Sequence, residues 1–107
     1  MFYNADDLPG RELLPGIKMK VLTHGDNTLL CEFHLAAGAV IPAHNHPQEQ
    51  SGYLVSGRLR FFGDEGELVV EAGSGWTFRG GVSHGVEVLA DSVAIEVFSP
   101  IRQDYLP

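Results

Sequence analysis

The 107-residue sequence contains a single cysteine, Cys31, so an internal disulfide bond is excluded. Cys31 lies in the apolar segment 29–33, where a small buried side chain is a better interpretation than a reactive nucleophile. Basic residues are also few: 7 Lys and Arg stand against 14 Asp and Glu, which gives a net charge of −7. Nucleic acids and anionic membranes both need a basic patch, so neither is expected as a partner.

Long apolar runs are absent as well. No run approaches the roughly 20 residues of a membrane-spanning helix, and the first residues lack the pattern of a signal peptide. We therefore expect a cytoplasmic protein. At this length we expect one domain, with residues 1–16 as an N-terminal leader and residues 17–107 as a single barrel domain.

Apolar spacing typical of helices is not sustained anywhere in the chain. Instead, 13 glycines and 6 prolines separate short segments rich in Val, Leu, Ile and Phe. This pattern predicts about ten short strands and an all-β, antiparallel double-sheet barrel of jelly-roll type. A plain β-sandwich is the alternative, but it does not explain the clustered histidines. Ser56-Gly57 and Ala90-Asp91 are predicted to be turns between strands.

The predicted last strand, residues 92–99, has an unusual outer face. If Glu96 faces the barrel interior, the opposite face consists of Val93, Ile95 and Val97. An apolar β-branched face of this kind is rarely left in water. Another sheet, the leader or a second copy of the chain must cover it, and we favour a homodimer.

Residues with metal-binding chemistry gather in segment 38–57 and recur once later. His44 and His46 are two apart, which places both side chains on one face of an extended chain. Gln50 supplies an oxygen at the start of the next strand, and His84 follows glycines that permit a close backbone approach. Three imidazoles and one oxygen suit one divalent transition metal ion (Zn, Ni, Mn or Fe) with open coordination positions. The competing interpretation is that these histidines merely end strands.

Both regions resemble the two motifs of the cupin family. In the first motif Gln50 stands where most cupins have Glu, and in the second Arg79 replaces a proline and Val88 an asparagine. The resemblance implies the cupin double-stranded β-helix and the metal ligands His44, His46, Gln50 and His84. The glycines and histidines that match the two motifs are Gly38, His44, His46, Gly57, Gly73, Gly81 and His84.

Gln50 changes the character of such a site. A neutral ligand set leaves a divalent ion its full +2 charge, which makes it a stronger Lewis acid and a better anchor for a carboxylate. The same neutrality weakens metal binding and is less suited to oxygen activation.

Residues 96–106, and the phrase His-x-His-Pro-x-Glu-Gln-x-Gly-Tyr at residues 44–53, resemble the pectin-degradation cupins. That family converts cyclic 4,5-unsaturated monouronates from pectin and alginate breakdown to linear 5-keto-4-deoxyuronate. The resemblance implies a small anionic sugar acid as substrate and Glu96, Phe98 and Arg102 as catalytic residues. The family has Asp where this chain has Glu96, which is longer by one methylene.

Two other functions remain open at this point. One is a different small-molecule cupin enzyme, such as a dioxygenase or an isomerase of another small acid or sugar. The other is a non-catalytic module or sensor that binds a metal or a sugar acid. A dioxygenase would require iron and consume oxygen, and the neutral Gln50 argues against it. The sequence leaves undecided whether Tyr53, Arg60 or Trp76 lies near the substrate.

Overall fold

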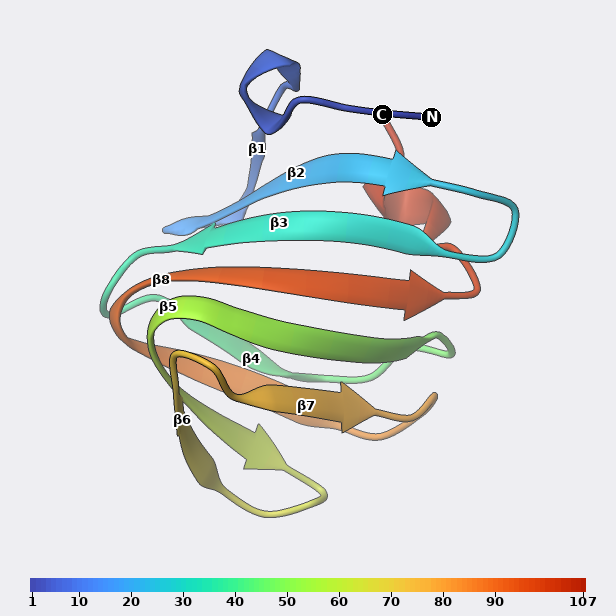
Figure 1. The fold of residues 1–107 in the computed structure, drawn as a ribbon. Coiled ribbons are helices and arrows are strands. Elements are labelled where there is room, and N and C mark those ends of the chain that lie inside the picture. The colour runs from blue at the N-terminus through green and yellow to red at the C-terminus, as the bar shows by residue number, and fades with distance from the viewer.

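The computed structural model describes residues 1–107 and confirms the all-β prediction (Figure 1). No helix in it is long and apolar enough to span a membrane. Eight strands and two short 3-10 helices follow one another as η1 (Ala5–Asp7), β1 (Arg11–Leu14), β2 (Ile17–His24), β3 (Leu29–Leu35), β4 (Val40–His44), β5 (Glu49–Gly63), β6 (Leu68–Glu71), β7 (Gly75–Phe78), β8 (His84–Ser99) and η2 (Gln103–Tyr105).

The two longest strands, β5 and β8, pair with each other along their length and take part in both layers of the barrel (Figure 1). Residues 92–98 of β8 pair with β3, whereas its residues 84–87 pair with β4. In the same way, residues 50–53 of β5 pair with β7 and residues 58–61 pair with β6. One layer therefore contains β1, β2, β3 and β7, and the other contains β4 and β6. This is the predicted jelly-roll architecture.

The two predicted turns inside these strands are wrong. At Ser56-Gly57 and Ala90-Asp91 the chain bends from one layer to the other without ending the strand, so eight strands replace the expected ten. The pairing register shifts around Ser56, and Gly57 adopts φ of +98° with no room for a Cβ beside Ser92. Small residues and glycine suggested a chain reversal, but long-range pairing carries each strand through a bulged bend.

The predicted leader contributes to the barrel. Its residues include β1, which pairs antiparallel with β2, and Leu13 packs against the core. In β3, buried apolar side chains alternate with less buried ones. Cys31 has no exposed surface, and burial raises the pKa of its thiol to about 12. The core cluster comprises Ile17, Met19, Leu29, Cys31, Phe33, Leu35, Leu54, Leu59, Val70, Val86, Val88, Ala94 and Phe98.

The outer face of β8 remains partly open. Val93 and Ile95 are half-buried, and Val97 is 37% exposed. On the neighbouring strand β5, Tyr53 and Val55 are exposed too. The structure of one chain therefore leaves an apolar patch on this face of the sheet.

Candidate metal centre

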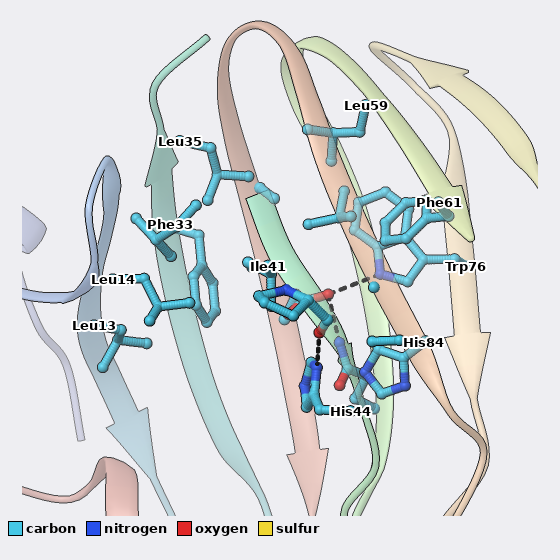
Figure 2. A pocket seen from close by; sticks show the side chains of 18 of the residues that line it. Leu13, Leu14, Phe33, Leu35, Ile41, His44, Leu59, Phe61, Trp76 and His84 are labelled. Carbon is cyan, nitrogen blue, oxygen red and sulfur yellow. Dashed lines mark hydrogen bonds between the residues drawn. The ribbon is translucent and has the colours of Figure 1, made fainter. Parts of the chain in front are cut away.

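The three histidines predicted as ligands lie close together. Figure 2 shows two of them, His44 and His84, at the cavity. His44 ends β4 and pairs with His84, which begins β8, while His46 lies in the loop after β4. One ring nitrogen from each lies within 4.8 Å of those from the other two. Phe78 stacks on His84 with ring centroids 4.3 Å apart and planes 3° from parallel, which holds that imidazole in place.

Glycines bring the two histidine-bearing loops together, as the sequence predicted. A Cβ on Gly80 would overlap the carbonyl oxygen of Pro47, so only glycine allows this approach. The next residue, Gly81, has φ of +84° and donates its backbone N–H to the carbonyl of His46 at 2.8 Å. Histidines that are far apart in the sequence are thereby held close enough to bind one metal ion.

All three imidazoles have the same orientation toward the backbone. In each, Nδ1 lies within hydrogen-bond distance of a carbonyl two residues away. A carbonyl only accepts, so Nδ1 carries the proton and Nε2 keeps its lone pair for a metal ion. The distances are 3.0 Å from His44 to Pro42, 2.9 Å from His46 to Gln48 and 2.9 Å from His84 to Val82.

The Nε2 atoms provide the test of whether a metal ion fits. His84 Nε2 is buried and has no hydrogen-bond partner. His46 Nε2 lies 2.8 Å from Gln50 Oε1, so two lone pairs face each other. Burial lowers the pKa of His46, and lowers that of His84 to about 4, so neither ring carries a second proton at neutral pH. Two ligands of one ion at about 2.1 Å each lie about 3 Å apart, so this donor set fits a shared cation.

Gln50 connects the histidines to a buried acid. Its Nε2 donates to Glu96 Oε1 at 2.8 Å, and Trp76 Nε1 donates to the same oxygen at 2.7 Å (Figure 2). Burial raises the pKa of Glu96, while these two hydrogen bonds and the charge of Arg102 act in the opposite direction. The amide of Gln50 therefore presents its oxygen to the histidines and its N–H to the acid.

A cavity of about 380 Å³ opens onto these side chains. Of its 21 lining residues, 14 are hydrophobic, and Leu13 and Leu14 of the predicted leader are among them. The cavity also brings together most of the predicted site residues, namely His44, Gln50, His84, Glu96, Phe98 and Arg102.

The Arg102 side chain contacts two residues that follow it in the chain. Its guanidinium makes an ion pair with Asp104 at 2.8 Å and donates to the hydroxyl of Tyr105 at 2.9 Å. The same group lies 4.0 Å from the Tyr105 ring centroid and 5.5 Å from that of Phe98. The Arg102 side chain is only 13% exposed and lines the cavity, whereas Asp104 is largely exposed.

The structure decides the positions that the sequence left undecided. Trp76 lines the cavity, whereas the Tyr53 side chain is 52% exposed and Arg60 forms an ion pair with Glu87. Tyr105 also lines the cavity, and its contact with Arg102 does not follow from any pattern along the chain. The one sequence signal for Trp76 is its alternation with Phe78, which predicts a shared inner face.

The fold and the site define a cupin. Residues 31–99 match the family described as the cupin domain, and the chain belongs to this family. Pectin degradation protein KdgF of Dickeya dadantii (strain 3937) is 31% identical to it, over 98% of this chain and 97% of that protein. The predicted resemblance to pectin-degradation cupins is thereby confirmed.

Solved structures agree with this relationship. The structure of KdgF from Halomonas sp. has a TM-score of 0.93 and 28% identity, and the match covers 99% of this chain and 100% of that one. An RmlC-like cupin from Shewanella frigidimarina NCIMB 400 has the same TM-score of 0.93 at 24% identity, covering 98% of this chain and 95% of the other, and shows the fold alone.

Proposed function

We propose that this chain is a metal-dependent enzyme that opens the ring of cyclic 4,5-unsaturated monouronates to give linear 5-keto-4-deoxyuronate. One observation carries the proposal: a neutral set of four candidate ligands touches a buried acid through Gln50, and both Gln50 and the acid line one cavity. The similarity to KdgF, named for pectin degradation, supports this substrate class.

His44, His46, Gln50 and His84 would hold the metal ion, through three Nε2 atoms and Gln50 Oε1. When bound, a divalent ion supplies Lewis-acid polarisation of substrate oxygens and an anchor for a carboxylate. The chain's own residues then account for proton transfer and orientation.

Ring opening of an unsaturated uronate needs proton transfer but no oxidant. The hemiacetal hydroxyl on C1 loses its proton, the bond between C1 and the ring oxygen breaks, and the released enolate takes up a proton at C4. Glu96 suits both transfers because one oxygen of its carboxyl accepts no hydrogen bond from the protein and its side chain lines the cavity. The buried position favours its neutral form, which can donate a proton.

Arg102 and Phe98 would orient the substrate. The guanidinium donates hydrogen bonds to Asp104 and Tyr105 and has further N–H groups left. These can donate hydrogen bonds to a substrate carboxylate. Phe98 lies beneath the guanidinium and offers an apolar wall to one face of the sugar ring.

The direct test uses unsaturated monouronate made by a polysaccharide lyase, with ring opening followed by NMR. The protein is loaded separately with Zn, Ni, Mn and Fe. At least one of these forms should accelerate ring opening above the spontaneous rate. Glu96→Gln should lose most of that acceleration and keep its metal, while Glu65→Gln, at an exposed hairpin position, serves as the matched control. No acceleration with any metal would refute the proposal.

The apolar lining favours a second candidate function. With 14 of 21 lining residues hydrophobic, the cavity also suits an isomerase acting on a small acid less polar than a uronate. Turnover of such an acid, together with inertness toward unsaturated monouronate, would favour this candidate.

A further inference from the structure

Trp76 lies two strands away from the acid that it contacts. Gly52 on β5 pairs with Trp76 of β7 on one side and with Glu96 of β8 on the other. Two strand spacings amount to about 9.5 Å, which short side chains do not bridge. Here a long indole and a long glutamate meet across the middle strand, with Trp76 Nε1 2.7 Å from Glu96 Oε1.

Gly52 in the middle strand β5 leaves the space that this contact needs. A Cβ on Gly52 would overlap the indole of Trp76, so the ring lies directly over this glycine. Phe61 also packs against the indole, with its ring centroid 4.8 Å from that of Trp76. The indole is therefore confined to one orientation.

The two hydrogen bonds to Glu96 are unevenly distributed. Trp76 and Gln50 both donate to Oε1, while Oε2 accepts none and is not fully enclosed. Since two donors occupy Oε1, any proton on the carboxyl is placed on Oε2. Glu96 lines the cavity, and Oε2 is its one carboxyl oxygen without a protein donor.

We propose that Trp76 is a positioning residue that holds Glu96 Oε1 against Gln50, so that Oε2 alone faces the reacting molecule. A carboxyl free to rotate would present either oxygen, and misplacement of about 1 Å costs on the order of a hundredfold in rate. The kinetic consequence of this assignment rests on the proposed function, but the contact itself does not.

The contact is tested by NMR on the zinc-loaded protein. Trp76 is the only tryptophan, so ¹⁵N labelling gives one indole N–H resonance. Glu96→Gln should shift that proton, because a side-chain amide replaces the carboxyl that accepts the indole hydrogen bond. Glu65→Gln should leave it in place. An indole resonance unchanged by Glu96→Gln would overturn the assignment, whatever the substrate proves to be.

The consequence is tested by kinetics on metal-loaded protein with unsaturated monouronate. Trp76→Phe keeps an aromatic ring and removes the N–H, and should lower kcat by roughly tenfold or more with KM within about twofold. In a Glu96→Gln background the same change should cost nothing further. Thr77→Val, on the exposed face of β7, is the control for the strand itself.

The outcomes separate the two claims. A loss in KM alone, or an equal loss of kcat in both backgrounds, would overturn the positioning role while leaving the proposed function intact. An inactive native protein would refute the proposed function, and the indole resonance would still decide the contact.

Discussion

Gln50→Glu probes the contact between the proposed metal ligand and the buried acid. In the native chain, Gln50 Nε2 donates to Glu96 Oε1 at 2.8 Å. The substitution replaces this donor by a carboxylate oxygen, so two acids face each other in a buried site. Two carboxylates so close do not both ionise at neutral pH, and the pair therefore keeps one proton.

The size of the effect follows from this distance. At 2.8 Å and an effective dielectric constant of about 20, two negative charges repel by about 6 kcal/mol. This repulsion raises the pKa of the last proton on the pair. Burial already raises the pKa of Glu96 in the native protein, so the new pKa lies above that raised value.

The sign of the pH dependence is set by proton counts. Between the two pKa values, the folded variant holds one more proton than the folded native protein, while both unfolded chains hold none. The unfolding free energy of the variant should therefore fall with rising pH, relative to the native protein, by about 1.4 kcal/mol for each pH unit. Below the pKa of native Glu96 the two curves should run parallel.

Urea unfolding of metal-free protein from about pH 5 to pH 9 measures this difference. Gln50→Met removes the hydrogen bond without adding a charge, so the added slope should extend over a narrower pH range than in Gln50→Glu. Gln103→Glu, at an exposed position, should follow the native protein. Parallel curves for Gln50→Glu and the native protein across the whole range would refute the predicted contact.

Three other predictions concern the metal, the substrate and the assembly. His84→Ala should reduce bound metal well below one ion per chain in elemental analysis, because its buried Nε2 has no protein partner; unchanged metal content would contradict the ligand set. Arg102→Ala should keep the metal and raise KM for unsaturated monouronate by roughly tenfold or more, through loss of a charge-assisted bond; an unchanged KM would count against this role. We propose that a second copy covers exposed Val97, so light scattering should show a dimer that Val97→Lys converts to a monomer; a monomeric native protein at micromolar concentration would contradict the dimer.

Patterns within a few residues predicted much of the fold. Alternation along a strand is local, so the buried faces of β3 and of the second half of β8 could be predicted from the sequence. Bends at Gly57 and Ala90 could not, because a glycine or a small residue allows either a reversal or a bulge. Which one occurs depends on pairing between β5 and β8, far apart in the chain.

The candidate ligands His44, His46, Gln50 and His84 follow from the sequence, because their spacing and their flanking glycines are features of the chain itself. Their convergence around one point, with His84 Nε2 left without a partner, was decided by the packing of two distant loops. The ion pair of Arg102 with Asp104 likewise depends on how the last turn folds.

The sequence by itself determined the donor types, their order and the neutral charge of Gln50. Only the tertiary structure decided that Trp76 reaches over Gly52 to Glu96 and that one carboxyl oxygen remains free. The physical reason is that hydrogen bonds between side chains on different strands depend on register and on the space left by a missing Cβ. Those quantities exist only once the strands have paired.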